Sequence, residues 1–285
     1  MRMTPTATAG SWRSRLPLGV EGVLLLAGAV LLLLPYLWML STAVKSPAET
    51  FRLPLTLIPD SFHWDTFPRA LTHFAFPTYI LNSLIVASAV TVSSVVLSSM
   101  AGYAFTRFMF PGREVLFLFM LTTLMLPTEV VLVPQFLVVH ALGWLNTYQG
   151  LIVPTALDAF AIFLMRQFLL SFPKELIDAA RVDGAGEFTI YSRIVLPNLK
   201  PAIAAIAVFS FRDSWDQYIW PLVIVSRDAM KTFPIGVAQL ESEAVGVFNE
   251  QMAIATIGMI PMLLLFALAQ KAFVQGIVMT GLKGE

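Results

Sequence analysis

The chain has 285 residues, of which 57% are hydrophobic and only 13% are charged, whereas soluble domains carry about 25% charged residues. This composition excludes an ordinary soluble domain and predicts an integral membrane protein. The formal net charge is zero, so nothing in the composition indicates a nucleic-acid partner. The sequence contains no cysteine, which excludes disulfides, iron–sulfur sites and thiol catalysis. The three histidines are scattered without metal-ligand spacing, so we predict no metal site.

The first third of the chain predicts a tail, a membrane span and a cap. Residues 1–18 are polar and are expected to form a cytoplasmic tail. Residues 19–41 are apolar, and about 20 apolar residues cross a bilayer. This run is too long for a cleaved signal peptide and lacks a small-residue cleavage site. Residues 45–79 mix prolines and aromatics, and we expect them to form a small extracytoplasmic cap.

Five further apolar runs predict an all-α protein with six transmembrane helices. The runs cover residues 80–104, 115–132, 150–170, 202–225 and 253–274. Serines in the second span permit close helix packing in lipid, and Pro127 and Pro134 predict an irregular outer end for the third. We predict one membrane domain over residues 19–275, with its core at about 76–275, and a second cytoplasmic tail over residues 276–285.

Six spans place both termini on one side, and the distribution of positive charge indicates which side that is. The segments on the side of the termini hold twelve Lys and Arg residues, the opposite loops hold five, and Arg212 lies inside a span. Both termini are therefore predicted to be cytoplasmic, and so is the polar loop over residues 171–201.

This loop is too polar to cross a membrane, and its pattern predicts two short helices. Ser171 and Pro173 are typical of a helix start. Gly184 and Gly186 predict a break, since glycine adopts the left-handed conformation that ends helices. A second helix is expected from Glu187 to Leu196, ended by Pro197. Ala179 and Ala180 in the first helix have small side chains, which would let the backbone of another protein approach closely.

The loop contains Asp178-Ala179-Ala180, then Gly184 after three residues, and Ile194, Leu196 and Pro197 after nine more. At this spacing it resembles the EAA loop of ABC-importer permeases, whose motif is Glu-Ala-Ala, three residues, Gly, nine residues and Ile-x-Leu-Pro. The chain departs from it at Asp178, where the family usually has Glu, so an ion pair there would have a shorter reach. The resemblance implies that this loop docks on the ATP-hydrolysing subunit and transmits its movement. The coupling residues carried over in this way are Asp178, Ala179, Ala180, Asp183, Gly184, Ala185, Ile194, Leu196 and Pro197. An amphipathic loop lying on the cytoplasmic leaflet is the simpler alternative.

The resemblance also implies partners and a location. It predicts the type I importer permease fold in the inner membrane, a second permease subunit, two ATPase subunits and an extracytoplasmic solute-binding protein. The chain has no Gly-x-x-x-x-Gly-Lys-Ser/Thr phosphate loop, so we expect it to be no enzyme and to bind no cofactor, with ATP and Mg held by the partner subunits.

Charged residues inside the fifth span predict a translocation path, because charge at bilayer depth is costly and usually functional. If residues 202–225 form one helix, Asp213, Asp216, Gln217 and Trp220 lie along one stripe, and Arg212 can pair with Asp216. Aromatic rings among such polar groups are suited to sugars. The predicted path residues are Arg212, Asp213, Trp215, Asp216, Gln217, Tyr218 and Trp220. A purely structural Arg212–Asp216 pair is the alternative.

Further matches favour the carbohydrate branch of the family. Residues 211–222 resemble a segment of sugar permeases, with Asp216 in place of the common Asn. The outer loop resembles maltose-type permeases at Leu126-Pro127, Pro134, Leu142-Gly143, Asn146-Thr147 and Gly150. The same branch includes glycerol-phosphate permeases, so a sugar and a glycerol-phosphate or other polyol-like solute both stay open.

Two other classes of function also stay open at this stage. An ion-coupled secondary transporter would use Asp213, Asp216 and Glu129 as proton sites, and a membrane scaffold would carry no cargo. Glu129 and Asp158 lie near the outer ends of the third and fourth spans. They either line the same path or reach the lipid headgroups, and the second alternative is favoured.

Overall fold

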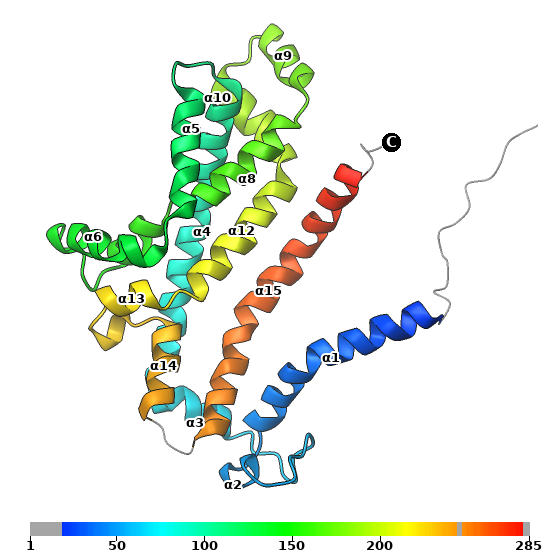
Figure 1. The fold of residues 1–285 in the computed structure, drawn as a ribbon, viewed down its shortest axis with the longest axis vertical. Coiled ribbons are helices and arrows are strands. Elements are labelled where there is room, and N and C mark those ends of the chain that lie inside the picture. Colours follow the sequence, from blue (N-terminus) through cyan, green and yellow to red (C-terminus); the bar gives the residue numbers. More distant parts are fainter. Residues whose placement is uncertain (1–18, 244–246, 282–285) are drawn as a thin grey trace, which may run out of the picture.

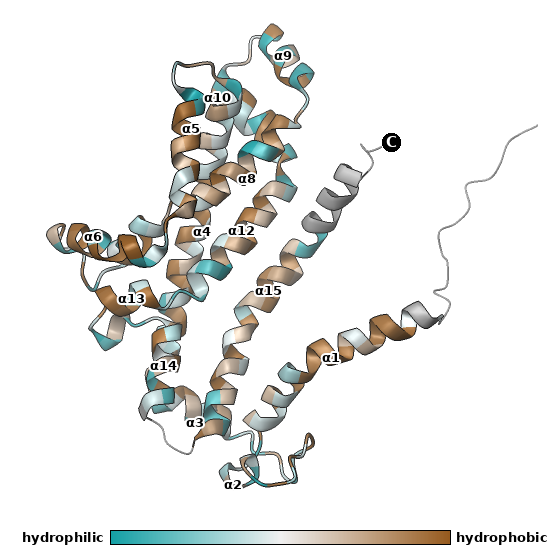
Figure 2. Cartoon of the chain, in the orientation of Figure 1, coloured by the Kyte–Doolittle hydropathy of each residue, from teal (hydrophilic) through white to brown (hydrophobic). Residues whose placement is uncertain are grey.

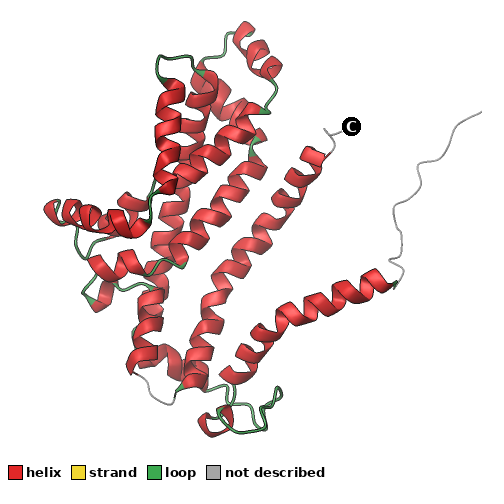
Figure 3. Cartoon of the chain, viewed as in Figure 1, coloured by secondary structure: helices red, strands yellow, loops and turns green. Residues whose placement is uncertain are grey.

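The computed structural model describes residues 19–243 and 247–281, and these residues form helices and loops without a strand (Figures 1 and 3). The helices make an elongated bundle. Helix α9 (Lys174–Val182) lies at one end of its long axis and α3 (Thr66–His73) at the other (Figure 1). We call these ends the α9 end and the α3 end. The predicted tail over residues 1–18 lies outside the described residues.

Three helices run the length of the bundle or extend from it: α1 (Val20–Ala43), α4 (Phe76–Arg107) and α15 (Phe248–Gly281). Each contains a stretch that is long and apolar enough to cross a membrane, which confirms the first, second and sixth predicted spans (Figure 2). Helix α15 continues past residue 275 to Gly281, and the boundary between membrane domain and tail at residue 275 stays a prediction.

The other three predicted spans are broken. Helix α5 (Arg113–Thr122) and the 3-10 turn Thr123–Met125 meet α6 (Thr128–Ala141) at an angle of 104°. Helix α7 (Tyr148–Ile152) and the turn Val153–Thr155 meet α8 (Ala159–Leu170) at 44°. Six spans result only if each bent pair counts as one. The irregularity predicted around Pro127 is confirmed, since Leu126 takes the extended backbone that a following proline favours.

The fifth predicted span is not one helix, which corrects the sequence reading. Helix α12 (Lys200–Trp215) ends before Asp216, and the chain resumes as α13 (Ile219–Ile224). The 16 residues of α12 rise about 24 Å, less than the hydrocarbon thickness of about 30 Å. Pro221 gives the physical reason. It has no N–H to donate to the carbonyl of Gln217, and its ring would crowd that carbonyl in a continuous helix.

The core of the bundle is built on α4. Helix α4 packs against α8 and α12, and α15 packs against α12 and α1. Gly102 lets α4 and α8 approach closely, because a Cβ at this position would lie 2.9 Å from Met165 Cγ. By contrast, apolar side chains of α1 such as Leu25 and Leu32 are exposed. Their burial requires lipid or another subunit.

At the α3 end, the predicted cap packs on the starts of α4 and α15. It contains α2 (Pro47–Thr50) and α3. Helix α14 (Phe233–Glu243) shares an apolar cluster with α3, and the turn Asp228–Met230 contacts α4. Lys45 is buried, with its ammonium 4.5 Å from the centre of the Trp38 ring. His73 Nδ1 lies 3.0 Å from Glu250 Oε2 and joins α3 to α15. His73 was expected to be an isolated histidine, so its pairing with Glu250 was not predicted.

Candidate functional site: a coupling segment and a polar cavity

Residues 171–201, which we call the coupling segment, form the two predicted helical parts (Figure 1). Helix α9 is followed by a second helical stretch made of α10 (Glu187–Thr189), a π-helical turn (Ile190–Val195) and α11 (Leu196–Asn198). The expectation that Pro197 ends this helix is wrong. The wider π-helical turn precedes the proline and accommodates its ring, and the helix ends at Asn198 before a 78° bend into α12.

The turn between the two helical parts depends on Gly184, as predicted. Its φ is +80°, in the left-handed region. The Gly184 N–H donates to the Arg181 carbonyl and the Ala185 N–H donates to the Ala180 carbonyl, both at 3.0 Å. These two bonds are those of a Schellman motif, which satisfies carbonyls left over at a helix end. Side chains with a Cβ are strained at this φ.

Helix α9 has one face attached to the bundle and one face free. Ile177 and Ala180 are 2% and 7% exposed and belong to the apolar cluster at the α9 end, with Met165, Ile190 and Val195. On the free side, Val182 and Phe188 are 87% and 77% exposed. Large apolar side chains exposed beside a polar loop are typical of a protein contact.

A hydrogen-bonded network fixes the turn to α4. Arg181 Nε donates to Glu187 Oε1 at 2.8 Å across the glycine turn, and the Tyr103 hydroxyl donates to Glu187 Oε2 at 2.9 Å. Arg181 Nη1 also lies 3.4 Å from Asp178 Oδ1. The hydrogen bond that Arg181 donates to Glu187 raises the pKa of Arg181, so the guanidinium stays charged. Sequence reasoning missed this network, although opposite charges six residues apart, flanking two glycines, were a usable sign.

A second cation on α4 holds the start of the coupling segment. Arg107 Nη2 donates to the carbonyls of Leu169 and Phe172 at 3.0 and 3.1 Å, where α8 ends. Ser99 Oγ and the Tyr191 hydroxyl are 2.7 Å apart, which ties the second helical part to α4 as well. Helix α4 therefore contacts the coupling segment at its beginning, middle and end.

The predicted coupling residues divide between the two faces. Asp178, Ala179, Asp183, Gly184 and Pro197 are exposed, Ala180 is buried, and Ala185, Ile194 and Leu196 are partly buried. The exposed set surrounds the Schellman turn. The buried set attaches it to the bundle.

A polar cavity of about 390 Å³ lies where α4 and α12 pass the breaks between α5 and α6 and before α8. We call it the Asp213 cavity. Asp158 reaches it from the N-cap of α8, where its carboxylate accepts from the Phe160 N–H at 2.9 Å. Ser210 and Ser94 are buried in its wall and hydrogen-bonded to each other at 2.9 Å. Its lining residues are Val90, Ser94, Thr123, Leu124, Thr128, Thr155, Leu157, Asp158, Ala159, Ser210, Asp213, Ser214 and Gln217.

A neighbouring cavity of about 350 Å³, which we call the Glu129 cavity, shares three of these residues, Thr128, Thr155 and Gln217. Glu129 and Gln135 come from α6, and Tyr218 and Trp220 from the segment after α12. Asp158 and Glu129 each line a cavity, which favours the alternative that they line the path over the expectation that they reach the lipid headgroups.

The structure separates the predicted path residues. Asp213 and Gln217 lie together in the Asp213 cavity, whereas Trp215 and Asp216 border hollows on another side of α12, against α14 and α15. Arg212 lies between these groups, 3.5 Å from Asp213 and 3.7 Å from Asp216. The single polar stripe does not exist, because the helix ends at Trp215.

The two tryptophans of this region are packed in the core. Trp215 is 3% exposed and stacks between Phe211 and Phe233, with ring centres 6.0 and 5.5 Å away. Trp220 is 4% exposed, and its Nε1 donates to the Gly150 carbonyl at 3.0 Å. Trp220 also lines the Glu129 cavity.

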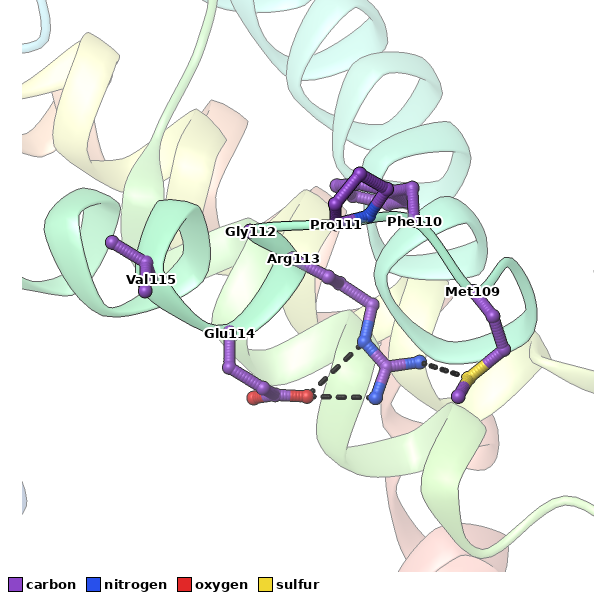
Figure 4. A pocket seen from close by; sticks show the side chains of 7 residues that line it. All are labelled: Met109, Phe110, Pro111, Gly112, Arg113, Glu114 and Val115. Carbon is purple, nitrogen blue, oxygen red and sulfur yellow. Dashed lines mark hydrogen bonds and ion pairs between the residues drawn. The ribbon is translucent and has the colours of Figure 1, made fainter.

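A larger hollow, of about 490 Å³, lies beside the short turn between α4 and α5 (Figure 4). It is lined by the consecutive residues 109–115, and its polar groups pair with each other, as Arg113 Nη2 and Glu114 Oε1 do at 2.8 Å. It lies at the α9 end, away from the carboxylates of the two cavities. We assign it no part in the path.

Comparison with known proteins places the chain in a family. Residues 94–279 match the model of the family described as "Binding-protein-dependent transport system inner membrane component". The chain is 34% identical over 259 residues to an arabinooligosaccharides transport system permease protein of Halalkalibacterium halodurans, covering 90% of this chain and 93% of the relative. It is 36% identical over 264 residues to an sn-glycerol-3-phosphate transport system permease protein of Pectobacterium atrosepticum, covering 90% and 94%.

A solved structure has the same fold. It is a bacterial ABC transporter involved in the import of the acidic polysaccharide alginate, with a TM-score of 0.78, 24% sequence identity, and coverage of 95% of this chain and 100% of the other. The chain belongs to the family of binding-protein-dependent transport inner-membrane components. The resemblance seen in residues 178–197 is confirmed at the level of the family.

Proposed function

We propose that this chain is one of two permease subunits of an ATP-driven importer, and that it lines half of the translocation path. The observation that carries the proposal is the two-faced coupling segment. One face is tied to α4 through Tyr103, Arg107 and Glu187, and the other exposes Val182 and Phe188 around the Schellman turn. A segment that transmits movement from one subunit to another needs a rigid attachment on one side and a free contact surface on the other.

In this proposal six spans place both termini and the α9 end in the cytoplasm, where an ATPase subunit docks on the coupling segment. Closure of the ATPase dimer moves the segment, and α4 moves with it. Changing a two-state population from 1:99 to 99:1 requires about 5.5 kcal/mol of differential coupling. The segment must therefore be stiff enough to transmit that energy, which supports a function for its three attachments to α4.

The proposed path runs through the Asp213 and Glu129 cavities, which face a second permease subunit in the assembled transporter. A binding protein delivers the solute from the opposite side of the membrane. The cargo is a sugar or another polyol-like solute. The relatives are named for two such cargoes, arabinooligosaccharides and sn-glycerol 3-phosphate.

Co-purification from the native membrane tests this proposal. An affinity tag on this chain should recover a second permease and an ATPase subunit, and the complex should hydrolyse ATP faster when a loaded binding protein is added. Recovery of the chain without an ATPase under conditions that preserve other importers would contradict the proposal. Uptake that stops with a protonophore yet survives ATP depletion would favour an ion-coupled carrier instead.

A further inference from the structure

Three interruptions of helical structure meet at the Asp213 cavity. Its lining includes Thr123 and Thr128 on either side of the α5–α6 break, Thr155 and Asp158 around the break before α8, and Gln217 just after α12. Backbone interrupted at membrane depth leaves N–H and C=O groups without helical partners. Such backbone is tolerated only where it is buried in protein or lines a water-filled cavity, and broken helices often build solute sites in transporters.

The side chains around this cavity are suited to hydroxyl groups. Hydroxyls are supplied by Ser94, Ser210, Ser214 and three threonines, an amide by Gln217, and carboxylates by Asp158 and Asp213. Ser214 Oγ is buried without a hydrogen-bond partner. A carboxylate accepts strongly from a hydroxyl, while serine hydroxyls can donate or accept. The hydroxyl groups of an uncharged polyol can therefore pair with the hydrogen-bond donors and acceptors of this cavity wall.

The charges around both cavities disfavour an anion. The described residues that line the Asp213 and Glu129 cavities include three carboxylates and no Lys, Arg or His. Arg212 lines neither cavity and is shared between Asp213 and Asp216. Glu129 and Asp158 have no ion-pair partner among the described residues. Like charges in a poorly solvated site repel more strongly than in water.

We infer that this subunit itself holds a solute site in the Asp213 cavity, and that the site takes neutral, polyhydroxylated solutes and rejects anionic ones such as glycerol 3-phosphate. This inference rests on the proposed function and narrows it. The hydroxyls of the solute donate to Asp158 and Asp213, and a phosphate would meet those same carboxylates without a cation from this chain.

The test uses the complete transporter, with both permeases, the ATPases and the binding protein, reconstituted in liposomes. The probes are the neutral trisaccharides arabinotriose, maltotriose and raffinose, compared with glycerol 3-phosphate. The variants are Asp158→Asn and Asp213→Asn. Asparagine is nearly isosteric, and at position 158 it remains a good cap for α8. The matched control is Asp228→Asn, an exposed carboxylate paired with Lys231 in the turn before α14.

We expect wild-type transporter to import at least one neutral probe and little glycerol 3-phosphate. Each cavity variant should slow neutral uptake by about tenfold to a hundredfold, the usual effect of losing a hydrogen bond to a charged group. Asp228→Asn should behave as wild type both in uptake and in basal ATP hydrolysis. Since the binding protein is the same throughout, these differences report on the cavity.

Two results would overturn the inference and leave the proposed function standing: neutral uptake at the wild-type rate in both cavity variants, or wild-type transporter that imports glycerol 3-phosphate as fast as any neutral probe. ATP-independent uptake, or no uptake of any probe by the assembled wild type, would instead count against the proposed function.

Discussion

The coupling segment and the broken-helix region around the Asp213 cavity both contain charged side chains, but these side chains serve different purposes in the two regions. In the coupling segment, charged side chains pair within the chain, as Arg181 and Glu187 do at 2.8 Å, and fix one conformation. Around the Asp213 cavity, Asp158 has no ion-pair partner among the described residues, and Asp213 lines open volume although Arg212 lies 3.5 Å away. The paired charges make the coupling segment rigid, whereas the carboxylates of the cavity keep hydrogen-bonding capacity for a solute.

Helix α4 connects the two regions. Tyr103 and Arg107 near one end contact the coupling segment, and Ser94, farther along the same helix, is buried in the wall of the Asp213 cavity. A continuous helix transmits displacement along its axis without new contacts. The contrast between the regions therefore predicts that changes in the coupling segment affect coupling, and changes near the cavity affect transport of the solute.

The largest expected effect is at the Schellman turn. Gly184→Val forces a β-branched side chain into the left-handed region, at a cost of about 1–2 kcal/mol, and the turn should relax to another shape. We expect ATP-driven uptake to fall below a tenth of the wild-type rate, with normal levels of protein in the membrane. Gly186→Ala is the control, because residue 186 has a negative φ and open space around a Cβ. Equal loss in both variants would show that the conformation of Gly184 is not the cause.

Removal of Phe188 should affect docking and leave folding intact. Phe188 is 77% exposed, so Phe188→Ala should change the thermal stability of the isolated chain very little. A residue central to an interface contributes more than about 1 kcal/mol, so affinity for the ATPase subunit should fall about tenfold. Met109→Ala, also highly exposed at the α9 end, is the control. Unchanged affinity for Phe188→Ala would place the ATPase elsewhere.

The link from Tyr103 to Glu187 should be measurable as a pairwise energy. Each of Tyr103→Phe and Glu187→Gln weakens the bond between the phenol and the carboxylate, and a double-mutant cycle isolates it. We expect a coupling energy of about 1 kcal/mol in unfolding experiments. The same variants should lower the uptake obtained per ATP hydrolysed. An additive double variant would mean that the network does not hold the turn.

The smallest expected effect is in the wall of the Asp213 cavity. Ser210→Ala removes the 2.9 Å hydrogen bond to Ser94, which also lines the cavity. We expect a loss of about 0.5 kcal/mol in unfolding free energy. Ser93→Ala, which removes a bond to the carbonyl of its own helix at Ala89, is the matched control. A loss of several kcal/mol would indicate a sealed core rather than a cavity.

Local patterns in the sequence predicted the coupling segment well. The glycine turn at Gly184 and the helices on either side depend on residues within about twenty positions, and the family resemblance in residues 178–197 reflects the same short-range pattern. The network missed there joins Glu187 to Tyr103, which are 84 positions apart. No periodicity within one helix reports such a pair.

The path was predicted less well because an apolar run says little about where a helix ends. Hydropathy across residues 202–225 is continuous, yet the missing N–H of Pro221 ends α12 at Trp215. The aromatic residues Trp215 and Trp220 were predicted to line the path. Tertiary packing buries most of both side chains, and Trp220 also lines the Glu129 cavity. Asp158 lines the same cavity as Asp213 because the chain breaks before α8, and the apolar run over residues 150–170 does not show where that break falls.

Labelling at Val182 tests most directly the central claim that the free face of the coupling segment is the ATPase contact. The chain has no native cysteine, so Val182→Cys, at a position 87% exposed, supplies a single thiol on this subunit. In inside-out vesicles the account predicts rapid reaction with a membrane-impermeant maleimide when the ATPase is stripped away, and protection when it is bound. Equal labelling with and without the ATPase, or labelling only from the opposite side of the membrane, would contradict it.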